Sequence, residues 1–118
     1  WANPVTWQAW EDAGLDYDST LTFHDHVGFR CGICYEYPAF NLETRRRLRL
    51  QERPLIAMEG TIFSYMRISS LATLELLTML ANRCRQFGGT MSLLWHNSSL
   101  LSRKDRELYM QVISSLFL

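Results

Sequence analysis

The segment HDHVGFRCGICY, residues 24 to 35, places two histidines and two cysteines within eleven positions. Imidazole nitrogen and thiolate sulfur are ligands that Zn²⁺ prefers, and a structural site holds four of them in a tetrahedron. The spacing is His24-x-His26, four residues, then Cys31-x2-Cys34. Most structural sites separate their ligand pairs by a dozen or more residues, so four is cramped. Two interpretations stay open: a small zinc module, or loop histidines and thiols lining a pocket.

The three cysteines limit the other chemistry of this segment. Cys31 and Cys34 have the spacing of a redox pair, but no helix begins after Cys34 to stabilise a thiolate. With Cys84 the total is three, which is odd and too few for a disulfide scaffold. Free thiols are typical of a reducing compartment, and we expect a cytoplasmic protein.

The composition indicates one folded domain of ordinary size. Apolar residues make up 47% of the 118 residues and the formal net charge is zero. This balance argues against nucleic acid or an anionic membrane as the main partner. No run reaches the roughly 20 apolar residues of a membrane helix, and WANPVTWQAW does not resemble a signal peptide. The one local charge excess, RRRLR at residues 45–49, is predicted to be a solvated face, with an anionic glycan or an acidic partner as the alternative.

The N-terminal half mixes helix, strand and loop signals. Asn3 and Pro4 before an aromatic run predict a short helix that ends at Gly14. Alternation over residues 17–23 predicts a strand. Residues 28–38 suit a partly extended loop with one short strand, and residues 41–53 a strand or loop.

The C-terminal half alternates strands and helices. The nearly continuous apolar run over residues 54–62 predicts a strand covered on both faces. Residues 69–87 predict a helix capped by Ser69 or Ser70. A second buried strand is expected over residues 90–96, and a final amphipathic helix from 103 to 118. This order predicts a mostly parallel α/β sheet.

So few strands cannot close a barrel of about eight strands. Residues 1–118 are therefore interpreted as one partial domain, the second part of a larger α/β domain. Uncovered strand edges favour pairing with other chains, so self-association is a further expectation.

Four segments, taken in order, resemble a known family: YDSTL, GFRCGICYEYPAF, RPLIAMEGTI and GGTMSLLWHNS. Together they are similar to the C-terminal part of bacterial polysaccharide deacetylases, which are carbohydrate esterase-type hydrolases. The resemblance implies a distorted (β/α) barrel and removal of N-acetyl groups from a surface polysaccharide or its precursor. It also implies that the full-length protein holds a divalent metal, which we expect to be zinc. The family's catalytic aspartate and metal-binding motifs would lie before Trp1, so this chain would hold no metal and be inactive alone.

Two residues carry the implied chemistry. His96 in SLLWHN matches the family's later histidine, and Glu59 in LIAMEG is similar to its acidic residue at the preceding strand. A histidine at the carboxyl end of a parallel strand suits protonation of a leaving amine. A nearby carboxylate could hold the imidazole, the alternative being an ion pair of Glu59 with Arg30 or Arg53.

The remaining candidates have weaker support. Arg30, between Phe29 and Cys31, is predicted to orient a carboxylate or a sugar group, or to form a structural ion pair. Asp18 is a candidate for substrate contact, with turn stabilisation as the default. Trp95 and Tyr35 are candidates for stacking on a sugar ring. The alternatives to a deacetylase are a non-catalytic carbohydrate-binding or assembly module, and the zinc module of His24, His26, Cys31 and Cys34.

Overall fold

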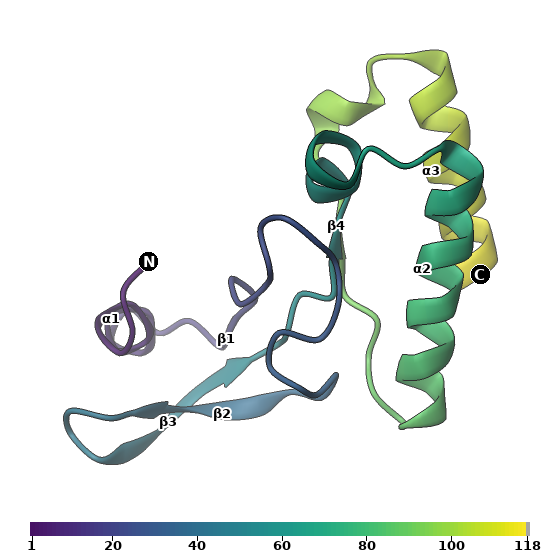
Figure 1. Cartoon of the computed structure of the whole chain (residues 1–118). Helices are drawn as coiled ribbons and strands as arrows, with labels where there is room; N and C mark the ends of the chain where they lie inside the picture. The colour runs from purple at the N-terminus through teal and green to yellow at the C-terminus, as the bar shows by residue number, and fades with distance from the viewer. Residues whose placement is uncertain (118) are drawn as a thin grey trace.

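The structure is a computed structural model, and it describes residues 1–117. The chain is elongated, with principal extents of 47 × 31 × 23 Å. A small sheet covered by the first helix forms one end, and a pair of long helices forms the other (Figure 1). Each end has its own apolar core. The fold class is mixed α/β, as predicted, but with two small sheets.

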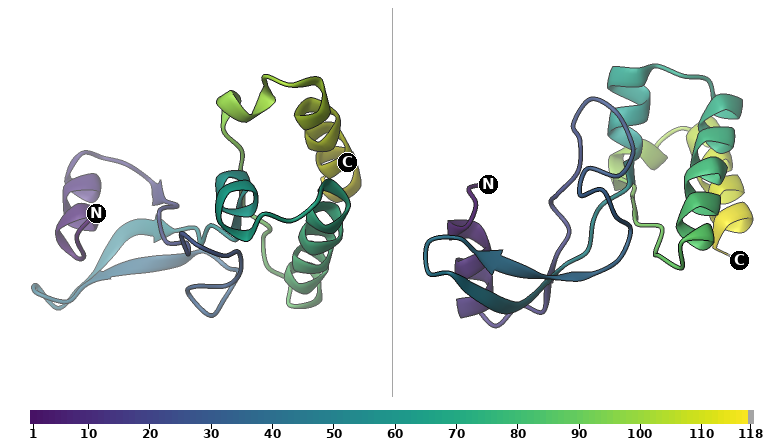
Figure 2. Two further views of the ribbon diagram at one scale, coloured as in Figure 1. Left: turned by 45° about the horizontal axis from the view of Figure 1, so that its top comes forward. Right: turned by 60° about the horizontal axis from the view of Figure 1, so that its bottom comes forward.

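The first sheet has the strand order β1–β3–β2. Strand β1 (Tyr17–Asp18) runs parallel to β3 (Arg46–Glu52), and β2 (Tyr37–Asn41) pairs with β3 as an antiparallel hairpin. The Asn41 side chain accepts hydrogen bonds from the backbone of Glu43 and Thr44, both at 3.0 Å, which shapes the hairpin turn. Both views of Figure 2 show this hairpin extending away from the long helices.

From Arg47 to Glu52, strand β3 alternates between residues that face solvent and residues that face the core. Leu48, Leu50 and Glu52 are buried, while Arg47 and Arg49 are exposed. The predicted strand and the predicted solvated arginine face are both confirmed.

Helix α1 (Val5–Asp12) covers this sheet and is the predicted short helix. Its buried residue is Trp7, whereas Val5 is 60% exposed. The Glu11 carboxylate accepts hydrogen bonds from the backbone N–H groups of Arg49 and Leu50. Helix α1 therefore supplies the hydrogen-bond acceptor for two backbone N–H groups of β3.

The second sheet is a parallel pair, β4 (Ala57–Met58) and β5 (Leu93–Leu94). Both strands are shorter than the predicted runs over residues 54–62 and 90–96. Directly after β4 the chain turns into a π-helix, η1 (Thr61–Met66), where the sequence predicts continued strand. The strand predicted over residues 17–23 is likewise reduced to β1.

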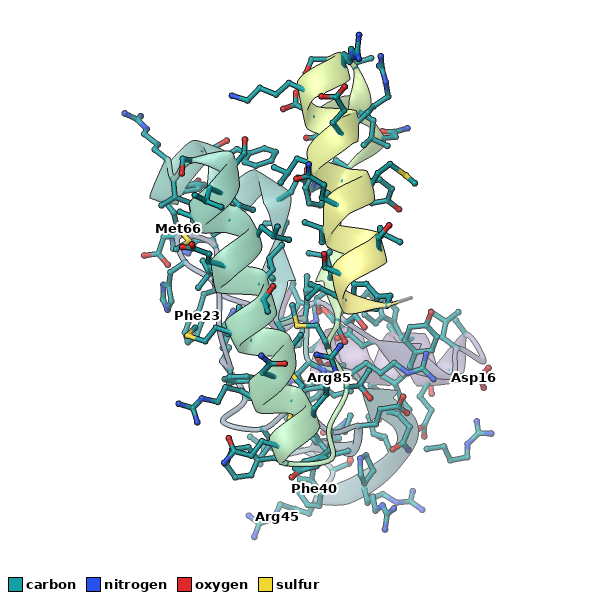
Figure 3. The ribbon with its side chains drawn as sticks, turned by 90° about the vertical axis from the view of Figure 1, so that its right-hand side faces the viewer. Asp16, Phe23, Phe40, Arg45, Met66 and Arg85 are labelled. Carbon is teal, nitrogen blue, oxygen red and sulfur yellow. The ribbon has the colours of Figure 1, made fainter. Side chains whose placement is uncertain are left out.

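The two long helices are confirmed. Helix α2 (Ser70–Gln86) begins at Ser69, whose hydroxyl accepts a hydrogen bond from Ala72 N at 3.2 Å. Helix α3 (Arg103–Leu116) buries Leu108, Val112 and Leu116 as its pattern predicts. Figure 3 shows α2 and α3 side by side, and their apolar faces enclose the larger core. The short 3₁₀ turn Asn97–Leu100 connects β5 to α3.

The barrel of the deacetylase type is not confirmed. The parallel pairing between β4 and β5 agrees with the predicted order, but the longest ladder is the antiparallel hairpin. Among residues 1–117, no helix combines the length and the apolar composition needed to cross a bilayer.

Candidate functional site

Glu59 and His96 emerge from the same edge of the second sheet. Glu59 directly follows β4, and His96 comes two residues after β5. The strands run parallel, with Ala57 opposite Leu93. Because parallel strands end at one edge, the side chains that follow them meet there.

The two side chains form a close contact. His96 Nδ1 lies 2.8 Å from Glu59 Oε1 and 3.0 Å from Glu59 Oε2. The Glu59 side chain is only 1% exposed, whereas 49% of the His96 side chain is exposed. A carboxylate in this position fixes the proton on Nδ1 and the orientation of the ring. The other ring nitrogen, Nε2, is left to meet a ligand.

Ser99 completes the set around Glu59. Its hydroxyl donates to Glu59 Oε1 at 2.8 Å, and its backbone N–H donates to the carbonyl of His96 at 3.0 Å. Ser99 therefore donates to the same carboxylate as the imidazole. A nucleophilic serine would instead give its proton to the histidine, so Ser99 is a positioning residue in this arrangement.

The sequence was compared with known protein families, curated proteins and solved structures. None of them matches the chain. The function is therefore inferred from the side chains and their geometry, with the resemblance as a hypothesis.

The alternative ion pairs for Glu59 do not form. Arg53 contacts Glu36, with Nε 2.6 Å from Oε1, and its guanidinium lies over the ring of Tyr17. Arg30 is exposed and donates to the carbonyl of Thr22 at 2.6 Å. The structure thus places Arg30 at a turn and not beside the Glu59 carboxylate.

The two candidates for stacking on a sugar ring, Trp95 and Tyr35, contact residues other than His96. Trp95 packs edge-to-face on Phe63 and Tyr109, at centroid distances of 5.7 and 5.3 Å. Tyr35 donates its hydroxyl to the carbonyl of Phe87 at 2.5 Å. Trp95 is thus packed against the core, and Tyr35 belongs to a separate groove described below.

Asp18 belongs to a second polar cluster, in the smaller core. It is 2% exposed and pairs in register with Glu52, which is fully buried. The indole N–H of Trp7 donates to Asp18 Oδ2 at 2.9 Å and lies 3.3 Å from Glu52 Oε2. The backbone N–H and hydroxyl of Thr20 also donate to Asp18. Turn stabilisation, the default role, is present, and the buried partner Glu52 was not predicted.

This cluster perturbs the acidity of its members. Burial, followed by the charge and hydrogen bonding of Asp18, raises the pKa of Glu52 to about 8. Glu52 is therefore largely protonated at neutral pH. Nearby, the Tyr37 hydroxyl lies 3.4 Å from Cys31 Sγ. Burial raises the pKa of both the Tyr37 phenol and the Cys31 thiol.

The four residues of the possible zinc module have separate partners. His26 Nδ1 lies 2.7 Å from Asp25 and its ring stacks on Phe23. His24 packs edge-to-face on Tyr65, and Cys31 contacts Tyr37 while Cys34 lies in the larger core. Within residues 1–117, no group of three or more His, Cys, Asp or Glu side chains is arranged to hold a metal ion. The structure does not bring these residues together as a site.

Some of these contacts have local signals in the sequence. Leu48 and Leu50 alternate with arginines, and continuing that period places Glu52 on the buried face. Ser99 follows His96 at the spacing of a single tight turn. The partnership of Trp7 with Asp18 has no local signal, because it joins α1 to β1 through the tertiary fold.

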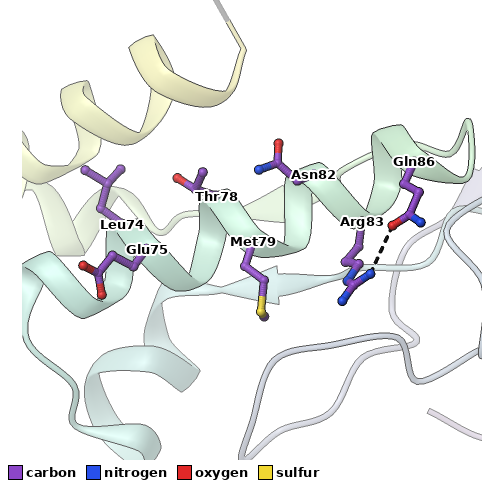
Figure 4. A pocket seen from close by; sticks show the side chains of 7 residues that line it. All are labelled: Leu74, Glu75, Thr78, Met79, Asn82, Arg83 and Gln86. Carbon is purple, nitrogen blue, oxygen red and sulfur yellow. Dashed lines mark hydrogen bonds between the residues drawn. The ribbon is translucent and has the colours of Figure 1, made fainter.

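A shallow hollow of about 610 Å³ lies along α2 and not at His96. Figure 4 shows Met79 and Arg83 projecting from α2 beside it, and Arg83 donating to Gln86. Its lining is Leu74, Glu75, Thr78, Met79, Asn82, Arg83 and Gln86.

Proposed function

We propose that this chain provides the proton-donating part of a metal-dependent deacetylase acting on a polysaccharide or a glycan precursor. The observation that supports it is the half-exposed imidazole of His96 held by the buried carboxylate of Glu59. The resemblance of the LIAMEG and LLWHN segments to bacterial polysaccharide deacetylases supplies the reaction class.

The geometry suits one step of N-deacetylation. When the amide carbon–nitrogen bond breaks, the leaving amine must gain a proton, and an imidazolium can supply it from Nε2. The Glu59 carboxylate accepts from Nδ1 and stabilises the charged ring, and the Ser99 hydroxyl steadies the carboxylate. After proton transfer, the neutral ring retains the proton on Nδ1 and still donates it in a hydrogen bond to the Glu59 carboxylate.

A divalent metal, zinc by expectation, is implied by the resemblance. The donor residues of this chain do not fit one, because the candidate ligands in residues 1–117 do not converge. No step is therefore assigned through a metal, and this chain is proposed to lack deacetylase activity alone. A cytoplasmic location is part of the proposal, since the three cysteines are free.

Binding of an N-acetylated glycan to the His96 edge tests the proposal. We expect an N-acetylglucosamine oligomer to shift the ring signals of His96 in NMR spectra. Ser99→Ala should weaken binding about two- to fivefold, because one hydrogen bond that positions Glu59 is lost. Ser98→Ala is the matched control, since Ser98 is exposed and next in sequence.

Two results would contradict the proposal. One is binding that leaves the His96 ring signals unchanged. The other is acetate release by this chain without any added component, which would show that it does not lack the metal-binding part. The glucosamine oligomer without acetyl groups serves as the control ligand in both measurements.

A non-catalytic carbohydrate-binding module is the second candidate. The observation in its favour is a groove of about 420 Å³ beside Tyr35, Met79 and Phe87, which are 42%, 49% and 60% exposed. Aromatic faces of this kind suit the apolar face of a sugar ring. In the same titration this candidate predicts shifts at Tyr35 and Phe87, with His96 unaffected.

A further inference from the structure

Two of the three free cysteines pack in the same apolar core, although 50 positions separate them in the sequence. Cys34 is 6% exposed and Cys84, on α2, is 1% exposed, and both belong to the same buried cluster. Cys31, by contrast, contacts Tyr37 near the smaller core. The neighbour of Cys34 is therefore not the cysteine three positions away but the one on α2.

The backbone holds the two cysteines against each other. Gly89 N donates to the carbonyl of Cys84 at 2.8 Å, and Thr90 N donates to the carbonyl of Cys34 at 2.7 Å. A side chain at Gly89 would place Cβ only 2.1 Å from Cys34 Sγ. Glycine is thus needed where the sulfur of Cys34 packs on the turn that follows α2. The hydrogen bond from the Tyr35 hydroxyl to the Phe87 carbonyl also joins the residue after Cys34 to the end of α2.

One route from solvent to this pair is a groove that Cys34 lines. Cys34 lines the apolar groove of about 420 Å³ between the 29–35 segment and α2. Met79 and Arg83 project from the same side of α2 (Figure 4), and both belong to the groove lining. The guanidinium of Arg83 gives the groove a positive charge that favours an anionic reagent.

We propose that Cys34 and Cys84 form a redox site that closes to a disulfide when the chain meets a small-molecule disulfide such as oxidised glutathione. This inference does not rest on the proposed deacetylase function. The surrounding hydrogen bonds bring the 34–35 segment and the end of α2 together before any reaction. A disulfide forms most readily between cysteines that the fold already holds in one packed region.

The chemistry balances as two thiol–disulfide exchanges. The thiolate of Cys34 attacks one sulfur of the oxidant, forming a mixed disulfide and releasing one small thiol. Cys84 then attacks the Cys34 sulfur, forming the internal disulfide and releasing the second small thiol. The two cysteines are oxidised, the oxidant is reduced, and the two thiol protons pass to the released thiolates.

The two cysteines have different roles in this order of events. Burial and the neighbouring Cys34 raise the pKa of Cys84 to about 11, so its thiol stays protonated at neutral pH. Cys34 reaches the groove and is the residue that an oxidant meets first. Cys84 reacts once the mixed disulfide brings an electrophilic sulfur beside it.

The disulfide would secure one long loop. The segment before Cys34 crosses the second sheet, where Gly28 N donates to the Ile56 carbonyl at 2.9 Å. Its His24 carbonyl accepts from the Thr61 hydroxyl at 3.1 Å. Joining Cys34 to Cys84 therefore ties this loop to the end of α2. We expect slower amide hydrogen exchange over residues 27–36 in the oxidised protein.

The test is oxidation of the folded chain with oxidised glutathione, followed by mass spectrometry. We expect a monomer that has lost two hydrogen atoms, with peptides linking Cys34 to Cys84. The thermal midpoint should rise by about 10 °C on oxidation and return on reduction. Cys34→Ser and Cys84→Ser should each abolish the cross-link and this rise.

Cys31→Ser is the matched control and should still form the cross-link with an unchanged thermal shift. A Cys31–Cys34 linkage in the folded protein would overturn the proposal. So would stable glutathione adducts on Cys34 that never resolve, or a Cys34–Cys84 link that forms only in urea. Near-UV circular dichroism verifies that each variant is folded. A missing cross-link then reports on the cysteine pair and not on unfolding of the chain.

Discussion

At the scale of single residues, the two buried glutamates have opposite surroundings. The Glu59 carboxyl group contacts the imidazole of His96 and accepts a hydrogen bond from the Ser99 hydroxyl. Glu52 faces Asp18, a second acid, and its Oε1 is buried without a hydrogen-bond partner. One carboxyl group therefore faces an imidazole and a hydroxyl, and the other, beside a second acid, is held neutral.

The neutral state of Glu52 predicts a specific pH dependence. Its pKa is raised from the ordinary 4.5 to about 8 in the folded chain. Between these values the folded protein holds a proton that the unfolded chain releases. The free energy of unfolding should therefore fall as the pH rises through this range, by about 2–4 kcal/mol, and level off above it.

Glu52→Gln should remove that dependence, because a neutral amide cannot release the proton. Urea unfolding of both proteins at about pH 5 and about pH 8.5 measures it. Glu36→Gln is the control, since Glu36 is exposed and pairs with Arg53 on the surface. An equally steep pH dependence in Glu52→Gln would show that another group is responsible.

At the scale of elements, the two long helices follow their local signals, whereas the two strands of the second sheet are shorter than theirs predict. Helix α2 has its hydroxyl cap at Ser69 and a buried side that includes Leu77, Leu80 and Cys84. Strands β4 and β5 pair over two residues each, although the apolar runs around them are longer. A helix closes its hydrogen bonds within itself, whereas a strand needs a neighbour.

The cap of α2 can be tested directly. Ser69→Ala removes the acceptor for Ala72 N, and we expect the free energy of unfolding to fall by about 1 kcal/mol. Ser70→Ala is the matched control, because it changes the adjacent serine and keeps the cap. Equal effects of the two substitutions, measured by urea unfolding, would mean that the Ser69 hydroxyl does not stabilise the helix.

At the scale of the whole molecule, the second sheet has an uncovered edge. Strand β5 pairs with β4 alone within residues 1–117, and Leu94 on it is 41% exposed. Beside it lies an apolar hollow of about 440 Å³ lined by residues of β5 and α3, among them Trp95 and Tyr109. Uncovered apolar strand edges promote pairing between chains.

We therefore expect the chain to self-associate as its concentration rises. Leu94→Lys should shift the population towards monomer, because a charge on an edge strand opposes pairing. Light scattering after size-exclusion chromatography measures the shift. Leu101→Lys is the control, since Leu101 is 82% exposed but lies outside any strand. A wild-type chain that stays monomeric at high concentration would contradict this expectation.

What the sequence alone determined is mainly local. The periods of α2, α3 and β3, the cap at Ser69 and the exposed arginine face all follow from spacing within a few residues. The meeting of Glu59 with His96 was also predictable, because two parallel strands place the residues after them at one edge. Each of these inferences needs only a repeat length or a strand direction.

Only the tertiary structure decided which distant side chains became partners. It separated His24, His26, Cys31 and Cys34, whose closeness in sequence had left a zinc site open as an alternative. It joined Asp18 to Glu52 and placed Cys34 beside Cys84. It also shortened the strands and replaced the expected barrel with two small sheets. The physical reason is that these contacts depend on how separate elements pack. The spacing of side chains along the sequence does not determine that packing.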